Sequence, residues 1–323
     1  MKSLLIICSM FCMTIQFSSC SDDPTDVIIP PWISPPPIDG CPRWSPSGDR
    51  ILYYHRGIDS IFSDGNYTIN PDSAGLWIIN PDGTNRHLLL NTGSTTADWS
   101  PDGNWIAFSS NGYIYKARMR LGQVDTASIQ MLTNDGDGPS HFPSWSPDGS
   151  WIAFDCTPEN HDSIWRIRSD GMERFKIKDY ARDPDYAPEG NRIVYLKWSS
   201  GKIGPDIYSM DLATKEEMRL THLEGSVLDP EYSPDATRVV FSNMNICIIN
   251  SDGTGLCRIA GFQGIDPSWS PSGGQIVFIK ANSSDWNNHG VVFIMNDDGT
   301  GLRQLTRDVS NGLQSESHKC IEE

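Results

Sequence analysis

One phrase recurs six times along the chain, and this repetition constrains the fold more than any other feature. The copies are PRWSPSGDRILYY from Pro42, ADWSPDGNWIAFSS from Ala97, PSWSPDGSWIAFDC from Pro143, PDYAPEGNRIVYLK from Pro184, PEYSPDATRVVFSN from Pro230 and PSWSPSGGQIVFIK from Pro267. The aromatic residue before the turn recurs from Trp44 to Trp269, so five intervals cover 225 residues and average 45. This period is typical of a four-stranded propeller blade.

Each repeat predicts four strands in order. The first ends at the aromatic residue, and the SPDG turn follows, in which proline fixes φ and glycine accepts a positive φ. Apolar runs such as WIAF predict a second strand covered on both faces by neighbouring blades. The third and fourth strands form a hairpin, with Asp-Gly at the bend in four of the six copies. The sequence therefore predicts an all-β fold, a six-bladed propeller of four-stranded antiparallel blades.

The N-terminus predicts an export signal rather than part of the fold. Residues 1–19 contain Lys2, a short apolar run and the small residues of FSSC, which end at Cys20. FSSC resembles the lipobox of bacterial lipoproteins, in which the cysteine is lipidated; the alternative is an ordinary signal peptide. Residues 20–40 are rich in proline and predict an extended tether. We expect an outer-membrane lipoprotein that faces the periplasm or the cell surface and contacts the membrane only through its lipid.

The charge of the chain excludes one large class of partner. The formal net charge is −16 and the isoelectric point is about 4.7. A surface this acidic repels nucleic-acid phosphates, so we expect no nucleic-acid partner. Acidity that serves solubility alone is the simpler explanation, and an acidic docking face is the other.

The repeats also carry a family resemblance. W-S-P-D-G followed by I-A-F, a D-G-T hairpin and a final L-T resembles the WD-like repeat of the TolB-type propellers. The resemblance covers Cys41 to Thr306, which implies a ring around a central channel over residues 41–306 and a tail over residues 307–323. It does not include the N-terminal α/β domain of TolB, so the role of TolB itself is not carried over.

Ring closure raises the question of disulfides. Each repeat supplies its four strands in order, which leaves no strand to pair between the first and last blades. A Cys41–Cys320 bridge would join the ends of the ring, and an exported protein is in an oxidising compartment. Cys247 and Cys257 lie on adjacent strands of one hairpin, where a bridge needs the right register. Cys156 is expected to be a buried thiol.

Catalytic motifs are missing from the sequence. It has no G-x-S-x-G elbow, no H-E-x-x-H, no C-x-x-C pair and no phosphate loop. We therefore expect a binding protein rather than an enzyme, and no required cofactor.

Aligning the repeats places three carboxylates at one position. Asp183, Asp229 and Asp266 precede the first strands of successive repeats, where the other repeats have Cys41, Thr96 and Phe142. These aspartates should line one side of the channel mouth, where they could bind a basic side chain or a divalent cation such as calcium. The alternative is that each caps its own turn.

The loops on the same face offer a second set of candidates. His55, His141, His161, His222 and His289 belong there, and oligogalacturonate lyases, a related class of propeller, hold a metal with histidines at such a face. The long segment from Arg56 to Gly75 contains Tyr67, which together with Trp286 could contact a glycan or a peptide.

The sequence thus favours a monomeric, lipid-anchored binding scaffold for an envelope protein or peptide at the loop-rich channel face. The alternative is a polysaccharide-binding or lyase-type propeller with a histidine and acid metal site.

Overall fold

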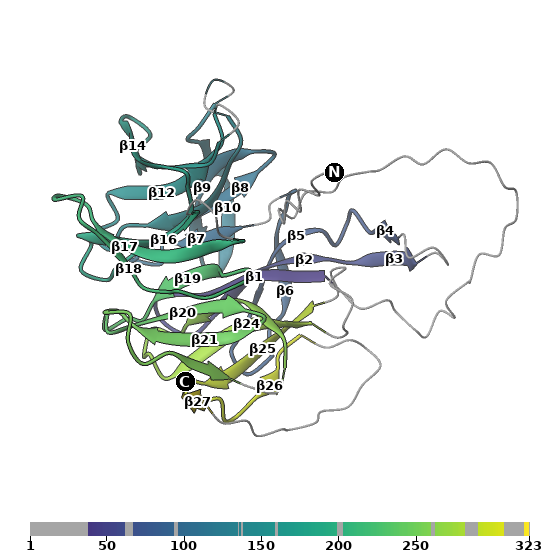
Figure 1. The fold of residues 1–323 in the computed structure, drawn as a ribbon. Helices are drawn as coiled ribbons and strands as arrows, with labels where there is room; N and C mark the ends of the chain where they lie inside the picture. The colour runs from purple at the N-terminus through teal and green to yellow at the C-terminus, as the bar shows by residue number, and fades with distance from the viewer. Residues whose placement is uncertain are drawn as a thin grey trace, which may run out of the picture.

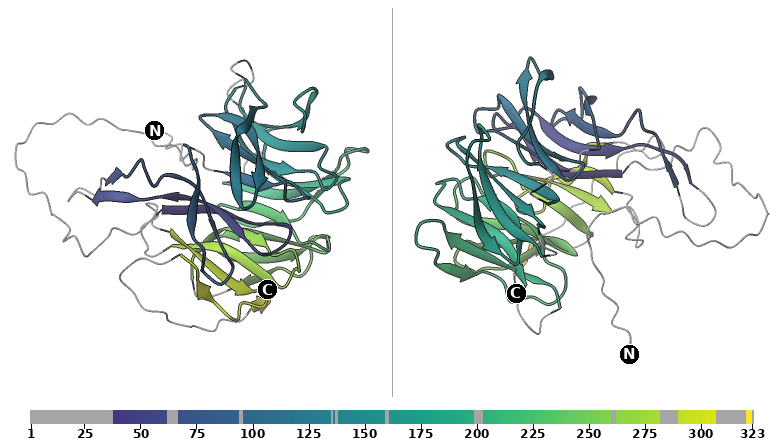
Figure 2. Two further views of the ribbon diagram at one scale, coloured as in Figure 1. Left: turned by 180° about the vertical axis from the view of Figure 1, so that it is seen from behind. Right: turned by 90° about the horizontal axis from the view of Figure 1, so that it is seen from above.

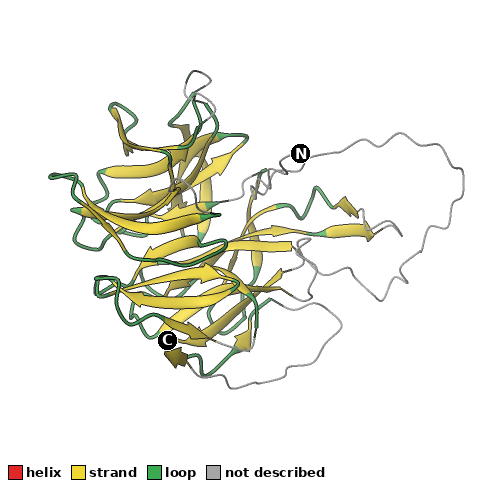
Figure 3. Ribbon diagram, in the orientation of Figure 1, coloured by secondary structure: helices red, strands yellow, loops and turns green. Residues whose placement is uncertain are grey.

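The computed structural model describes residues 38–61, 67–93, 96–134, 136, 138–158, 161–198, 203–259, 262–281, 290–306 and 320–322. The predicted signal peptide, Cys20 and most of the tether lie outside these residues. Within them the chain forms strands and turns without a helix (Figure 3), and hence without a helix that could cross a membrane.

Six antiparallel sheets stand around a ring as the blades of a propeller, which confirms the predicted fold (Figures 1 and 2). Blade one contains β1 (Ile38–Trp44), β2 (Ile51–Arg56), β5 (Gly75–Ile79) and β6 (His87–Asn91). Blade two contains β7 (Ala97–Trp99), β8 (Trp105–Ser110), β9 (Tyr113–Arg120) and β10 (Gln123–Met131). Blade three contains β11 (Ser140–Trp145), β12 (Trp151–Cys156), β13 (Ser163–Arg168) and β14 (Arg174–Asp179).

The second half of the ring repeats this order. Blade four contains β15 (Ala181–Tyr186), β16 (Arg192–Trp198), β17 (Pro205–Asp211) and β18 (Glu217–Arg219). Blade five contains β19 (Leu228–Tyr232), β20 (Arg238–Asn243), β21 (Asn245–Asn250) and β22 (Cys257–Ile259), and β27 (Cys320–Glu322) adds a fifth strand at its outer edge. Blade six contains β23 (Gly264–Trp269), β24 (Gln275–Ala281), β25 (Gly290–Asn296) and β26 (Arg303–Gln304). A separate two-stranded sheet of β3 (Ile58–Ile61) and β4 (Tyr67–Ile69) lies between β2 and β5 in the sequence.

The recurring phrase forms the hairpin between the first two strands of a blade. In blade three the Gly149 N–H donates to the Ser146 carbonyl, and Gly149 has φ +71°. The Ser146 hydroxyl donates to Asp148 and accepts the Trp151 N–H at 2.9 Å. Asp148 is therefore a turn residue whose hydrogen bonds lower its pKa.

Two ends of the ring follow from this strand order. The SPDG turns and the hairpins between third and fourth strands, such as Leu121–Gly122, lie at one end, which we call the turn face. The connections between second and third strands, such as Asn111–Gly112, and those between blades, such as Tyr180, lie at the other, which we call the loop face.

Apolar packing between blades forms the core. At the seam between blades three and four, Ala153 and Ile164 pack against Tyr195 and Met210, and all four side chains are buried. Comparable clusters join the other blades. Because both faces of a blade are buried, its second strand is apolar without alternation, as in Ile152–Phe154.

The ring closes without a shared strand. Tyr53 and Ile79 of blade one pack against Val277 and Ile294 of blade six. Beside this apolar seam, the buried Asp39 carboxylate contacts His55 Nδ1 at 2.6 Å and accepts a hydrogen bond from the Thr306 hydroxyl of blade six. Side-chain packing and buried hydrogen bonds therefore hold the first and last blades together.

Both predicted disulfides are wrong. Cys41 is a free thiol at the centre of the ring, whereas β27, which contains Cys320, lies at the outer edge of blade five. In the hairpin of β21 and β22, Cys257 is opposite Ile248, so Cys247 and Cys257 point to opposite faces of the sheet. Cys247 is a thiol that donates a hydrogen bond to the Asn245 carbonyl. Cys257 is disulfide-bonded, but its partner is not Cys247. The Cys156 thiol is buried, as predicted.

Candidate functional site

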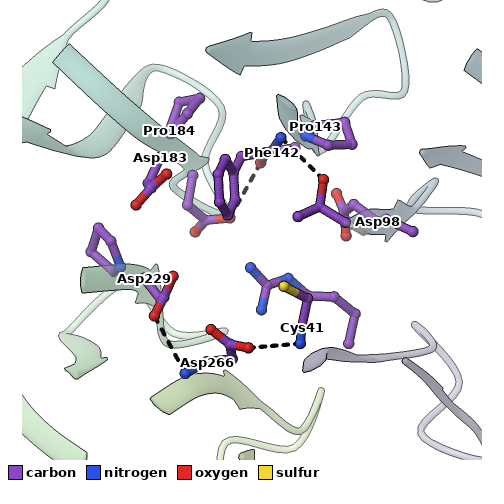
Figure 4. Close-up of a pocket in the computed structure, with 14 residues that line it drawn as sticks. Cys41, Asp98, Phe142, Pro143, Asp183, Pro184, Asp229 and Asp266 are labelled. Atoms are coloured by element: carbon purple, nitrogen blue, oxygen red, sulfur yellow. Dashed lines mark hydrogen bonds between the residues drawn. The ribbon is translucent and has the colours of Figure 1, made fainter. Parts of the chain in front are cut away.

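The first strands of the blades enclose a narrow cavity on the ring axis (Figure 4). It measures about 30 Å³, which is space for one or two water molecules or for the end of one long side chain. The charged groups on its wall are Arg43, Asp98, Asp183, Asp185, Asp229 and Asp266. Five carboxylates therefore surround a single guanidinium on the described wall of the cavity.

One layer of acids, Asp98 and Asp185 of the cavity wall together with Glu231, joins three pairs of neighbouring blades. Asp98 accepts the Trp145 N–H of blade three at 2.7 Å, and Asp185 accepts the Tyr232 N–H of blade five at 3.0 Å. Glu231 accepts the Trp269 N–H of blade six at 2.8 Å. These acids precede the repeated aromatic residue, and each bonds the aromatic residue of another blade, so their first role is structural.

A second layer, nearer the loop face, contains the three predicted aspartates. Asp183, Asp229 and Asp266 have φ of 49°, 53° and 53°, a left-handed conformation that aspartate adopts more readily than most residues. Cys41 and Phe142 hold the same position in other blades and share this conformation. The left-handed residue produces a bulge in the first strand, where its pairing with the second strand shifts.

Two of these three aspartates bond to the following blade. The Asp266 carboxylate accepts the Cys41 N–H at 2.8 Å, and the Asp229 carboxylate accepts the Asp266 N–H at 3.3 Å (Figure 4). The partner N–H belongs to the next blade, so these bonds are not caps of the aspartates' own turns. Sequence reasoning placed the three carboxylates on one side of the mouth, and Figure 4 shows them there.

Asp183 differs from the other two. Its side chain is 8% exposed, and its Oδ1 atom is buried with no hydrogen-bond partner among the described residues. Burial raises the pKa of Asp183 to about 7, although Arg182 opposes the shift. A buried polar atom without a hydrogen-bond partner destabilises the folded state. Among the described residues that line the channel cavity, Asp183 is the one with such an atom.

Burial also raises the pKa of other acids in the channel. Burial raises the pKa of Asp98 to about 6 and that of Glu231 to about 7, and Arg43 counteracts both shifts. Arg43 lies 3.5 Å from Glu231. Burial and the charges of Asp266 and Asp229 raise the pKa of the Cys41 thiol, which keeps it protonated and unreactive at neutral pH.

Sequence reasoning named His141 as a loop-face candidate but missed two polar residues beside Asp183, which are Asp155 and Arg182. Asp155 on β12 is 4% exposed, lies opposite His141 of β11, and accepts a hydrogen bond from Arg182 Nε of β15 at 3.3 Å. A signal was present for Asp155, because it is the one acidic residue at its position in the six repeats. Aligned copies have Ser109, Leu196, Ser242 and Ile279 in place of Asp155.

The predicted histidine cluster is not assembled by the described residues. His55 contacts Asp39 inside the blade one seam, and His161 stacks on Tyr180 and contacts Asp179 at 3.3 Å. His141 is half-buried beside the channel mouth, and His222 is exposed. The described part of the chain contains no group of three histidine, cysteine, aspartate or glutamate side chains that could hold a metal ion.

The predicted aromatic surface lies largely outside the described residues. Tyr67 begins β4, but its side chain is not described, and Trp286 and His289 fall in a segment that is not described. The contact surface for a glycan or peptide therefore stays a prediction.

Comparison with known proteins agrees with the architecture. The family model described as the TolB beta propeller domain matches residues 170–318. An uncharacterised protein of Agrobacterium fabrum is 31% identical over 201 residues, which are 57% of this chain and 64% of the relative. The chain is a six-bladed β-propeller whose second half is similar to the TolB beta propeller domain.

Solved structures show how widely this TolB-like propeller fold occurs. A putative TolB from Agrobacterium tumefaciens superposes with a TM-score of 0.62 at 24% identity, over 68% of this chain and 84% of that one. TolB from Acinetobacter baumannii gives 0.52 at 17% identity, over 84% and 69%. The tricorn protease gives 0.59 at 17% identity, over 87% of this chain and 27% of the protease. At these identities the likeness concerns the fold alone.

Proposed function

We propose that this TolB-like propeller is an exported, lipid-anchored scaffold that binds an envelope protein or peptide at the loop face of its channel. The observation that carries the proposal is the acidic channel mouth, where five aspartates and one arginine, Arg43, line the cavity and Asp183 Oδ1 has no hydrogen-bond partner among the described residues. A partner that presents a lysine or arginine side chain supplies the missing positive charge.

The size of the cavity indicates how such a partner binds. A space of about 30 Å³ admits the end of one side chain but no backbone. The rest of the partner must therefore lie over the connections of the loop face, which differ from blade to blade in length and sequence. A rigid ring that presents variable loops is well suited to binding, because little order is lost when the partner docks.

The N-terminal sequence supports the location. Residues 1–19 have the form of an export signal, Cys20 stands at the lipidation position, and the segment up to β1 is rich in proline. A lipid at Cys20 would hold the propeller near a membrane while the extended segment keeps it away from the surface. Labelling with radioactive palmitate should mark the wild-type chain and leave Cys20→Ser unlabelled; equal labelling of both would contradict the anchor.

The binding proposal predicts a loss of partner capture when the mouth is neutralised. The full-length protein carrying Asp183→Asn, Asp229→Asn and Asp266→Asn should recover at least about tenfold less partner from cross-linked envelopes than wild type. Asparagine tolerates the left-handed backbone at these positions, so the fold should be kept.

A matched variant controls for net charge. Asp82, Asp252 and Asp298 are exposed at hairpin bends of the turn face, where each accepts hydrogen bonds from a threonine. Changing these three to asparagine removes the same charge at the opposite face and should leave capture unchanged. Equal capture by the mouth variant and wild type would refute the proposal, as would equal losses in the two triple variants.

A further inference from the structure

We propose that the seam between blades three and four contains a subsite for one guanidinium or ammonium group, which enters from the channel mouth and displaces protons from Asp155 and Asp183. This inference rests on the proposed function and assigns the cationic group of the partner to particular residues. It concerns two acids that each have one oxygen atom without a hydrogen-bond partner among the described residues.

Two unsatisfied oxygen atoms carry the inference. Asp155 Oδ1 and Asp183 Oδ1 are both buried and have no hydrogen-bond partner among the described residues, and the two residues are 4% and 8% exposed. The other oxygen of Asp155 accepts a hydrogen bond from Arg182 Nε, and Asp229 and Asp266 each accept a backbone N–H of the next blade. An ionised carboxylate at this depth requires a counter-charge or a proton.

The local charges do not balance. Asp155, Asp162 and Asp183 share the single guanidinium of Arg182, which lies 3.3 Å from Asp155 and 3.7 Å from Asp162. His141 adds no charge at neutral pH, because burial and the nearby Arg182 lower its pKa although Asp162 opposes this. Three carboxylates against one arginine leave an excess of two negative charges when all are ionised.

Protons supply the balance when no ligand is present. Burial raises the pKa of Asp155 to about 6, and the charge of Asp162 adds to this shift. Burial raises the pKa of Asp183 to about 7, and the charges of Asp155 and Asp162 add to this shift, while Arg182 opposes both. Asp266 also faces Asp183 and raises its pKa further. A bound cation favours the ionised carboxylates, so its binding must release protons below about pH 7.

An organic cation fits the donor set better than a metal ion. The seam offers the carboxylates of Asp155 and Asp183 and the neutral imidazole of His141, which is opposite Asp155, and it already contains Arg182. The described residues contain no group of three side chains arranged to hold a metal. A guanidinium offers several N–H donors in one plane, which two carboxylates on opposite sides can accept.

The test uses acetyl-arginine amide as the probe and acetyl-citrulline amide, its neutral isostere, as the control. Isothermal titration of the full-length protein in two buffers of different ionisation enthalpy measures the affinity and the protons released. At pH 6.5 we expect binding of the arginine probe with release of about one proton, and at pH 8.5 release of about none. Citrulline should bind at least about tenfold more weakly.

Two variants locate the site. At pH 8.5, Asp155→Asn and Asp183→Asn should each weaken binding of the arginine probe about tenfold. The control variant Asp229→Asn should change the affinity for the probe less than about threefold. Thermal unfolding of each variant confirms that it is folded. The inference is overturned if the arginine probe does not bind, if it binds at pH 6.5 without releasing protons, or if Asp229→Asn weakens its binding most.

These outcomes are separate from those for the proposed function. If the probe fails but partner capture still depends on the mouth aspartates, the subsite is wrong and the scaffold function stands. If the probe binds as described but partner capture does not depend on the mouth aspartates, the subsite stands and the partner docks at another surface.

Discussion

The propeller should unfold at a higher temperature at pH 5 than at pH 8. Asp183 and Asp155 have folded-state pKa values of about 7 and about 6, well above the ordinary value of 3.8. The folded state therefore holds protons that the unfolded chain has lost, and stability falls as pH rises from about 4 to about 7. For Asp183 alone, about three pKa units set an upper limit near 4 kcal/mol.

Calorimetry between pH 4.5 and 8.5 measures this effect. Asp183→Asn should make the fall in stability between pH 5 and pH 8 smaller, because it removes one of the buried acids whose pKa is about 7, the other being Glu231. Asp148→Asn is the matched control, since hydrogen bonds in the SPDG turn lower the pKa of Asp148 and it stays ionised over this range. A melting temperature that rises from pH 5 to pH 8 would contradict this prediction, because it would show that ionisation of the channel acids does not destabilise the folded state.

The Asp39→Ala variant should lose about 3–5 kcal/mol of unfolding free energy. Asp39 is 2% exposed and contacts both His55 of blade one and Thr306 of blade six. Removing its carboxylate leaves the buried His55 and Thr306 without this partner at a seam that has no shared strand. Denaturant titration gives the size of the loss, and hydrogen exchange shows where the ring opens.

Asp206→Ala provides the comparison within one blade. Asp206 is equally buried, and it accepts hydrogen bonds from Arg219 and Thr221, which all belong to blade four. Both variants should be destabilised, but faster exchange in β1 and β25 should appear in Asp39→Ala only. Faster exchange there in both variants, or in neither, would mean that the seam is not the weak point of the ring.

The repeats predicted the fold because they encode local structure. The SPDG turn, the apolar second strand and the Asp-Gly hairpin each depend on neighbours in the sequence, and six copies can form only similar blades. The same reasoning placed Asp148 in a turn and put Asp183, Asp229 and Asp266 on one side of the channel. Repeat position was enough for these conclusions.

The remaining features depend on register and on contacts between blades. A shift of one residue separates Cys247 and Cys257 onto opposite faces, and the sequence contains no sign of that register. Asp229 and Asp266 bond to N–H groups about 37 and 225 residues away, which no local pattern indicates. Asp155 could have been found, since it breaks the repeat at a position that faces the loop end of the channel.

Site-specific photo-cross-linking tests the central claim most directly. A benzoylphenylalanine at Phe142, which lines the channel mouth, should form an adduct with the partner in intact cells. The same probe at Leu121, fully exposed on the turn face, should form none. Adding Asp183→Asn, Asp229→Asn and Asp266→Asn should remove the Phe142 adduct. An adduct at Leu121 alone, or one at Phe142 that survives these changes, would contradict binding at the acidic channel mouth.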